Sequence, residues 1–310
     1  MYRLAVAYYQ ENLTQQEIAN KFGISRVMVS RMLKQSILEK MVEIKIHPPD
    51  NEDAGLEQQL EALFGLDEVI LVKSDAKVSQ GILEDIGKTA AEWLVGRLDG
   101  KETVALSWGK TLHAMVNALP PCNFPDMRIV QMIGGLGEPE ADSHASDLTF
   151  RMARVLNGKP RVLSSPGIVK TKEICENLKE DLQISETLRL AASADIALIG
   201  IGSFNSGSLI YDTDIILSQE DKKELKIHDA AGDISLRFFD AKGRLITGEI
   251  NNRIVGLDAA QIAQIPRRVG ISGGPGKLEA IHAACTGSLI NVLITDRDTG
   301  EKLLNIQQNG

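Results

Sequence analysis

The chain has 310 residues, of which 43% are hydrophobic, 25% charged and 4% aromatic. This composition predicts a folded chain with a sizeable core and excludes a disordered or fibrous protein. The formal net charge of −8 argues against a protein that coats nucleic acid without specificity. The charge is uneven, because residues 1–50 carry seven basic and five acidic side chains and the rest of the chain is strongly acidic.

The first residues predict two capped helices in close succession. After an apolar, helix-like stretch over residues 4–9, Thr14 stands three residues before Glu17, which is the spacing of a capping box. A helix therefore begins at Gln15. Gly23 ends it, since glycine tolerates the positive φ of a tight turn, and Ser25 caps a second helix over about 26–36.

The spacing of Ala19, Gly23 and Val29 is typical of a helix-turn-helix, with a small residue at the helix contact, a turn glycine and a branched residue on the second helix. The alternative is an ordinary helical hairpin with a solvated basic face. Residues 41–47 alternate apolar and polar side chains and predict a short wing strand. We therefore predict a winged helix-turn-helix DNA-binding domain over 1–52, ending in a linker at Pro48 and Pro49.

In this motif the N-terminal half of the second helix enters the major groove. We expect base contacts from four outward residues of that helix, and phosphate contacts from the lysine behind them and from the two glutamines that open the first helix. The candidate DNA-binding residues are Gln15, Gln16, Ser25, Arg26, Val27, Ser30, Arg31 and Lys34. One such module buries too little surface to be specific, so we expect a homodimer or homotetramer on operator DNA.

Residues 53–310 predict an α/β domain. Runs rich in Val and Ile alternate with helical segments, and this alternation predicts a largely parallel sheet with helices on both faces. Residues 235–239 and 244–246 flank a turn at Asp240–Gly243 and predict a hairpin at a sheet edge. The expected strands are 68–72, 103–107, 128–133, a strand at 162, 196–201, 268–272 and 290–295, and the expected helices include 80–98, 112–119, a helix through 150–156, and 278–284.

Ligands of such sheets gather at the carboxyl ends of the strands. Residues 107–111 follow one strand with hydroxyls, an ammonium and helix-opening amides, a set that suits a phosphate. A nucleotide-binding P-loop is rejected there, because Val104 stands where its first glycine is required. Glycine-rich turns follow three further strands. Each turn alone could be only a tight turn, but four at one sheet edge predict a site for an anionic ligand.

Three aspartates beside strand residues, Asp195, Asp233 and Asp240, could accept hydrogen bonds from sugar hydroxyls; capping or turn roles are the alternative for each. The candidate effector-binding residues are Ser107, Trp108, Gly109, Lys110, Thr111, Gly134, Gly135, Gly200, Gly202, Asp233, Asp240 and Lys277.

No catalytic or metal site is indicated by the sequence. The three cysteines stand far apart without a CxxC pair, and the five histidines lack metal-ligand spacing. No leader sequence and no apolar run long enough to span a bilayer is evident. We therefore expect a cytoplasmic protein without membrane contact, metal or cofactor.

These motifs resemble those of the SorC family of bacterial sugar-responsive transcriptional regulators over nearly the whole chain. The residues that carry the resemblance are 13–15 with 18–19, 106–112, 130–135, 194–202, 232–234 with 238–240, and 273–277. The resemblance implies an effector domain similar to the sugar-phosphate isomerase and glucosamine-phosphate deaminase fold, and a phosphorylated sugar or polyol as effector. It also implies that the 107–111 loop and Lys277 contact phosphate or sugar, and that Asp233 contacts the sugar.

One position departs from a related regulator of deoxyribonucleoside genes, in which a lysine before the paired glycines captures the sugar covalently. Ile133 stands at that position, so covalent capture is not expected. We therefore predict a non-enzymatic regulator of carbohydrate-metabolism genes. The alternatives are an isomerase-like or deaminase-like enzyme with an added DNA-binding module, which would need a placed acid and base, and an architectural DNA-binding oligomer.

Overall fold

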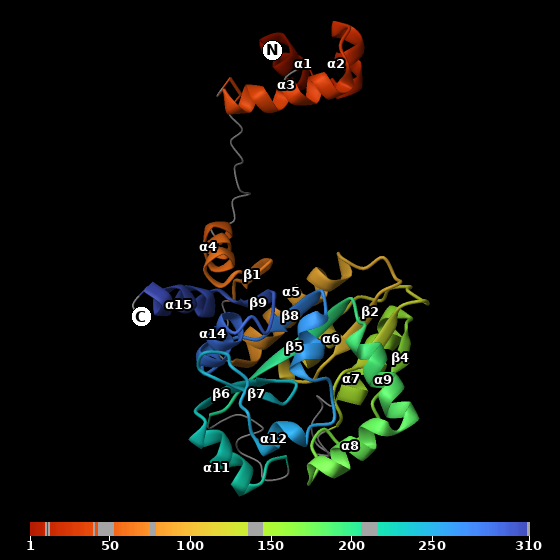
Figure 1. Cartoon of the computed structure of the whole chain (residues 1–310), viewed down its shortest axis with the longest axis vertical. Helices are drawn as coiled ribbons and strands as arrows, with labels where there is room; N and C mark the ends of the chain where they lie inside the picture. Colours follow the sequence, from red (N-terminus) through yellow and green to blue (C-terminus); the bar gives the residue numbers. More distant parts are fainter. Residues whose placement is uncertain are drawn as a thin grey trace. The chain divides into compact units, whose positions relative to one another are not determined.

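The computed structural model describes residues 1–9, 11, 13–39, 41–42, 53–74, 79–135, 145–205 and 216–308. Backbone contacts divide the chain into two compact units, Met1–Asn51 and Glu52–Gly310 (Figure 1).

The smaller unit contains three helices, α1 (Tyr2–Tyr9), α2 (Gln15–Phe22) and α3 (Arg26–Leu38). The predicted capping box is present: Thr14 Oγ1 accepts from the Glu17 amide, and Glu17 Oε2 accepts from the Thr14 amide at 2.8 Å. The turn residue Gly23 has a φ of 67°, as its predicted role requires. The predicted wing at 41–47 and the Pro48–Pro49 linker lie almost wholly outside the described residues.

A small core holds the three helices together. It consists of the buried side chains Leu4, Ala7, Ile18, Ala19, Val29 and Leu33. Ala19 and Val29 belong to it, as the helix-turn-helix spacing predicts. Phe22, the last residue of α2, is 38% exposed.

The larger unit is built on a parallel sheet with the strand order β1-β9-β8-β5-β2-β3-β4. All adjacent pairs along this path are parallel. Its strands are β1 (Glu68–Val72), β2 (Thr103–Leu106), β3 (Arg128–Gln131), β4 (Lys159–Arg161), β5 (Ile196–Ser203), β8 (Arg267–Ile271) and β9 (Val292–Asp296).

Helices cover both faces of this sheet, as the alternating pattern predicts. Alternate residues of one strand enter different cores: Val104 and Leu106 pack in one cluster and Ala105 in the other. The first cluster includes side chains of α5 (Ser79–Val95), α6 (Lys110–Ala118) and α7 (Ala145–Leu156). The second includes side chains of α4 (Ala54–Phe64), α8 (Lys172–Glu180), α9 (Leu182–Ala192), α14 (Leu278–Thr286) and α15 (Arg297–Gln308). Three further helices are α11 (Gln219–Ile227), α12 (Glu249–Asn252) and α13 (Ala259–Gln264).

The predicted hairpin over 235–246 forms around its turn but not over its first two residues. Strands β6 (Ala230–Ile234) and β7 (Arg237–Asp240) also pair, and β6 continues antiparallel onto the carboxyl half of β5. Ser235 and Leu236 form the turn with φ values of 50° and 60°, a left-handed pair that suits a tight hairpin. Asp240–Gly243 is the predicted turn. Beyond it, the Asp240 amide donates to the Arg244 carbonyl and the Ile246 amide donates to the Phe238 carbonyl, both at 3.0 Å, around an antiparallel bridge between Leu245 and Phe239.

Candidate DNA-binding surface and effector site

Helix α3 presents the outward face that its sequence predicts. Arg26, Val27, Arg31 and Lys34 are exposed, with Val27 at 79%, and Ser30 is half-buried. The opposite side of the helix is buried in the small core. The exposed cations and the isolated apolar Val27 therefore lie on one accessible helix face, an arrangement that can meet base edges and thymine methyl groups in a major groove.

A cleft of about 690 Å³ lies beside this face and brings three predicted residues together. Gln15 and Gln16 line it from the start of α2, and Arg26 lines it from the start of α3. Tyr8 and Tyr9 of α1 line the same cleft. Neither tyrosine stands out in the sequence, because only the packing of α1 against the other two helices brings them here.

In the larger unit, the loops that follow β2, β5 and β8 meet at the carboxyl edge of the sheet. Ser235 Oγ, from the β6–β7 turn, donates to Ser107 Oγ at 3.1 Å. The loop over residues 272–277, here called the effector loop after the role predicted for Lys277, reaches β5 twice: Ser272 Oγ and Lys277 Nζ both donate to the carbonyl oxygen of Ile201, at 3.2 and 3.1 Å. The structure thus joins four segments distant in sequence.

Asp233 is the most unusual group of this cluster. Its carboxyl group is 4% exposed and accepts a hydrogen bond from the Leu236 amide at 2.9 Å. Burial raises the pKa of Asp233 to about 6, against the smaller opposing effects of that hydrogen bond and of the Lys277 charge. A buried aspartate close to a lysine, at the carboxyl end of a parallel sheet, is typical of a functional site.

Lys277 lies near enough to Asp233 for each charge to affect the pKa of the other. Burial lowers the pKa of its ammonium, while the Asp233 carboxylate raises it and the charge of Lys110 lowers it further. The two lysines are therefore close enough to repel one another. An anion placed near them would relieve that repulsion, which is the electrostatic signature expected of a phosphate site.

The loop after β2 leaves its donors uncapped. Helix α6 begins after Gly109, which has a φ of 137° and supplies no side chain to cap the first amides of the helix. The indole nitrogen of Trp108 is buried and has no hydrogen-bond partner among the described residues. These N–H groups can donate to an oxygen-rich ligand.

Several predicted effector residues are engaged in internal contacts. The Gly134 amide donates to the Val255 carbonyl and the Gly135 amide to the Ser165 carbonyl, both at 2.9 Å. These two amides serve the packing of the loop after β3, so any contact with an effector would use other atoms. Ile133 is fully buried in a hydrophobic cluster.

Two predicted aspartates lie apart from the cluster. Asp240 accepts from the amides of Lys242 and Arg244 and pairs with the Arg244 guanidinium, which makes it a turn residue. Its turn packs against the C-terminal end of α14, through Gly243 and Gly287, whereas Lys277 lies at the N-terminal end. Asp195 precedes β5 and accepts from the Thr103 amide, at the amino end of the strands.

Sequence reasoning missed Asn205 and Asp296. Asn205 accepts from Ser203 Oγ and donates to the Gly276 carbonyl at 3.1 Å, tying the end of β5 to the effector loop. Asp296 ends β9 and accepts from the Gly274 amide. The polar residue at the end of β9 was a usable signal, but the adjacency of β8 and β9 appears only in the folded sheet.

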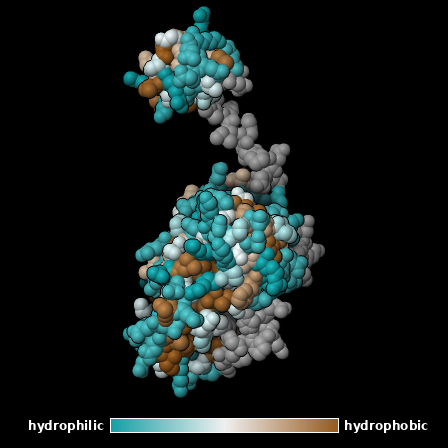
Figure 2. Space-filling model, turned by 90° about the vertical axis from the view of Figure 1, so that its right-hand side faces the viewer, coloured by the Kyte–Doolittle hydropathy of each residue, from teal (hydrophilic) through white to brown (hydrophobic). Residues whose placement is uncertain are grey.

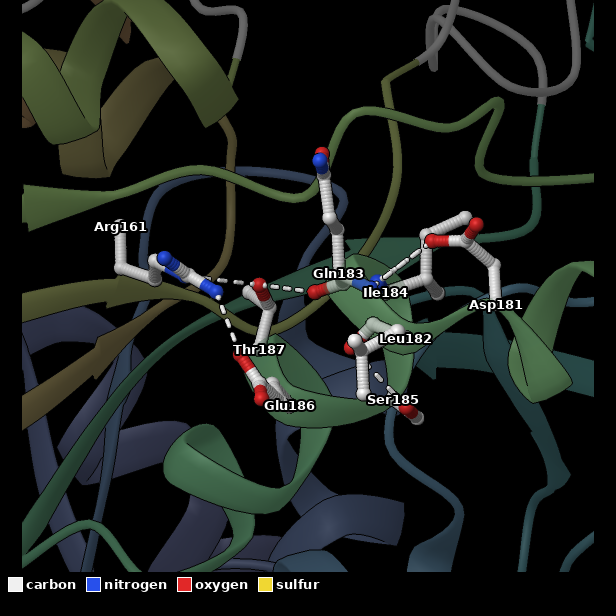
Figure 3. A network of polar contacts seen from close by, with 8 residues as sticks. All are labelled: Arg161, Asp181, Leu182, Gln183, Ile184, Ser185, Glu186 and Thr187. Atoms are coloured by element: carbon white, nitrogen blue, oxygen red, sulfur yellow. Dashed lines mark hydrogen bonds and ion pairs between the residues drawn. The ribbon is translucent and has the colours of Figure 1, made fainter.

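A second cleft, of about 730 Å³, lies beside the edge strand β4 and helix α9. Its arginine is already paired: Arg161 donates to Thr187 Oγ1 at 3.1 Å and to Glu186 Oε2 at 3.3 Å (Figure 3). Asp181 caps α9 at the other end of the network. Because its cation is satisfied internally, this cleft is a poorer anion site than the carboxyl edge.

Within the described ranges, no group of three or more His, Cys, Asp or Glu side chains could hold a metal ion. Among the same residues, no helix has the length and apolar character needed to cross a membrane.

Comparison with known protein families matches both units. A family model described as "Putative sugar-binding domain" covers residues 49–305, and the model "Bacterial regulatory proteins, crp family" covers residues 12–35. The deoxyribonucleoside regulator of Bacillus subtilis is 30% identical over 298 residues, covering 96% of this chain and 95% of that protein. The sorbitol operon regulator of Klebsiella pneumoniae is 30% identical over 306 residues, covering 97% and 96%.

The crystal structure of the full-length sorbitol operon regulator SorC from Klebsiella pneumoniae has a TM-score of 0.76 and covers 97% of each chain. Relatives named as transcriptional regulators thus span almost the entire chain, with a helix-turn-helix match at one end and a sugar-binding match over the rest. The chain belongs to the SorC family of sugar-binding, DNA-binding transcriptional regulators.

Proposed function

We propose that this regulator binds a phosphorylated sugar or polyol at the carboxyl edge of its sheet and that this binding changes its affinity for operator DNA. The observation that carries the proposal is the buried Asp233 carboxyl group at this edge, near the Lys277 side chain that bonds the end of β5, with the charges of Asp233 and Lys110 both acting on the pKa of Lys277. Two cations suit a phosphate, and a buried carboxylate suits sugar hydroxyls.

In this proposal each part of the site has a separate task. Lys277, Lys110 and the uncapped amides at the start of α6 hold the phosphate, with Ser107 and Thr111 as hydroxyl donors. Asp233 accepts hydrogen bonds from the sugar, and the Trp108 indole donates to it. Gly200 and Gly202 lack side chains, which lets the Trp108 carbonyl and the Asp233 carboxyl group lie against β5.

On the DNA side, we propose that Arg26, Val27, Ser30 and Arg31 read bases. Lys34, Gln15 and Gln16 hold phosphates, and Ser25 fixes the start of the helix through its cap on the Met28 amide. In this proposal the regulator binds its operator in the cytoplasm.

We infer that residues 53–310 also carry the oligomer contact, as a homodimer or homotetramer. Hydrophobic side chains gather on one face of the larger unit (Figure 2), and Phe150 and Leu182 are among its exposed large apolar residues. Apolar patches of this kind favour burial by another subunit.

A thermal-shift panel tests the effector proposal. Sorbitol 6-phosphate, glucose 6-phosphate and 2-deoxyribose 5-phosphate are compared with the same compounds lacking phosphate, because a ligand that binds the native state raises apparent stability. A shift with phosphorylated members alone supports the proposal. Equal shifts for phosphorylated and unphosphorylated members would remove the phosphate site from it.

One observation keeps an enzymatic alternative in view: an aspartate with a pKa of about 6 can exchange a proton at neutral pH. Incubation of the protein with each panel compound, followed by NMR of the sugar, distinguishes the two functions. Unchanged spectra support a regulator that only binds, whereas isomerised or deaminated products would establish an enzyme.

A further inference from the structure

The effector loop is held by Asp296, the last residue of β9, which immediately precedes α15. Gly274 donates its amide hydrogen to Asp296 Oδ2 at 2.6 Å. Asp296 is 5% exposed, and its carboxylate also accepts from the amide and hydroxyl of Thr299, at 2.9 and 2.7 Å. A single buried carboxylate therefore ties the effector loop to the first turn of α15, so the two cannot move independently without breaking charge-assisted hydrogen bonds.

Arg297, the residue after Asp296, extends this connection to the start of the larger unit. Arg297 Nε lies 3.1 Å from Asp53 Oδ1, and Lys73 Nζ lies 3.7 Å from Asp53 Oδ2. Asp53 is 2% exposed and stands immediately before α4, at the point where the chain enters this unit from residues 1–51. The Arg297 Nε–H is donated to Glu301, and Asp53 Oδ1 accepts no hydrogen bond among the described residues, so Arg297 stabilises the buried carboxylate through its charge. Displacing Arg297 therefore weakens the electrostatic stabilisation of Asp53.

The helix that carries these contacts is tightly seated. Gly300 of α15 approaches β1 so closely that a methyl group on it would lie 2.6 Å from Leu71 Cδ2. Close packing of this kind transmits a shift of the helix terminus as a rigid displacement. The first turn of α15 therefore connects the effector loop on one side with Asp53 on the other.

We propose that Asp296 and the Asp53–Arg297 ion pair couple the effector loop to the chain segment that leads to the DNA-binding unit. The proposal rests on the proposed function, since the coupling regulates DNA binding only if the 272–277 loop contacts the effector. A ligand that moves Gly274 changes the hydrogen bond between Gly274 and Asp296. This change shifts the first turn of α15, and the shift moves Arg297 relative to the carboxylate of Asp53.

Hydrogen–deuterium exchange of the full-length protein tests the coupling without any ligand. Asp296→Asn should speed exchange about tenfold, the effect of losing a charge-assisted hydrogen bond, both in the effector loop and in the first turn of α4. Thr299→Val, which removes one donor to Asp296, should give the same pattern with smaller amplitude. Asp298→Asn, an exposed neighbour in the same turn, should change neither segment. Faster exchange in the effector loop with an unchanged α4 would overturn the proposal.

The ion pair is tested in the same way. Arg297→Gln should speed exchange at α4, and adding Asp296→Asn should increase it by less than the sum of the separate effects, because both act through one route. Glu301→Gln, which removes the exposed partner of Arg297, is the matched control. Fully additive effects would contradict a shared route.

In a separate experiment, saturating inorganic phosphate should slow exchange at residues 107–111 and 272–277. Unchanged exchange there would count against the phosphate site alone, because the variants report the coupling without ligand.

Discussion

Gly202 lies against the carboxyl group of Asp233 so closely that a Cβ atom on Gly202 would stand 1.9 Å from Asp233 Oδ1. The two residues are paired across β5 and β6, so neither strand can move away without breaking the ladder. The absence of a side chain at residue 202 is therefore a condition for the buried position of Asp233.

Gly202→Ala should displace the Asp233 carboxylate and weaken effector binding, while destabilising the fold by about 1–3 kcal/mol through overpacking. Calorimetric titration with the best compound of the sugar-phosphate panel measures the first effect and chemical denaturation the second. Gly55→Ala is the control, because a Cβ there meets nothing within 4 Å. Unchanged effector affinity in Gly202→Ala would separate Asp233 from the site.

The raised pKa of Asp233 gives stability a defined dependence on pH. Between about pH 4 and 6 the folded state retains a proton that the unfolded state releases, so stability from this group falls as pH rises through that window. Asp233→Asn should therefore be more stable than the parent at pH 8, by at most about 3 kcal/mol, and the difference should vanish near pH 4. Urea denaturation at several pH values measures it.

Asp240→Asn serves as a control of opposite sign. Burial acts to raise the pKa of Asp240, but hydrogen bonds from Arg244 and Lys242 outweigh it and hold the pKa below its ordinary value. Asp240→Asn should be less stable than the parent at neutral pH, and the two proteins should be equally stable in acid. Parallel pH profiles for the parent and Asp233→Asn would show that Asp233 does not titrate abnormally.

Lys277→Ala should reduce affinity for a phosphorylated effector by about 1.5–3 kcal/mol, because it removes a charge-assisted contact. The affinity of Lys277→Ala for the unphosphorylated sugar should fall much less. Lys242→Ala removes an equal charge from an exposed turn and should leave effector affinity unchanged. Equal affinities of parent and Lys277→Ala for the phosphorylated compound in calorimetric titration would assign Lys277 a purely structural role through its bond to Ile201.

Arg31→Ala should weaken operator binding by about 1–3 kcal/mol while leaving effector binding intact, because Arg31 is exposed on the outward face of α3. Gel-shift titration against a duplex selected in vitro with the full-length protein measures the loss. Lys21→Ala removes a charge from the last turn of α2, where Lys21 pairs with Glu11, and should reduce operator affinity less than Arg31→Ala does. Equal losses for the two variants would indicate general electrostatics and not base contact.

Local signals in the sequence predicted local structure well. The Thr14–Glu17 capping box fixed the start of α2, and the apolar run from Glu68 to Val72 matched β1 residue for residue. The β6–β7 hairpin was missed because Ser235 and Leu236 adopt positive φ without the glycine or asparagine that normally signals it.

The site was predictable only in part, for a physical reason. Lys277 and the 107–111 loop follow strands, and parallel strands bring their carboxyl ends together, so their meeting could be expected. The contact of Gly202 with Asp233 depends on β6 turning back onto β5, and the role of Asp296 depends on the adjacency of β8 and β9. Both are long-range pairings that no local pattern encodes.

The most direct test of the regulator proposal measures both binding equilibria of the full-length protein in one thermodynamic cycle. Fluorescence anisotropy gives the affinity for the selected operator duplex with and without the best sugar phosphate, and calorimetry gives the affinity for that sugar phosphate with and without the duplex. Linkage requires the two affinities to change by the same factor, expected to be about 5- to 150-fold. An operator affinity that is identical with and without the bound sugar phosphate would contradict the proposal.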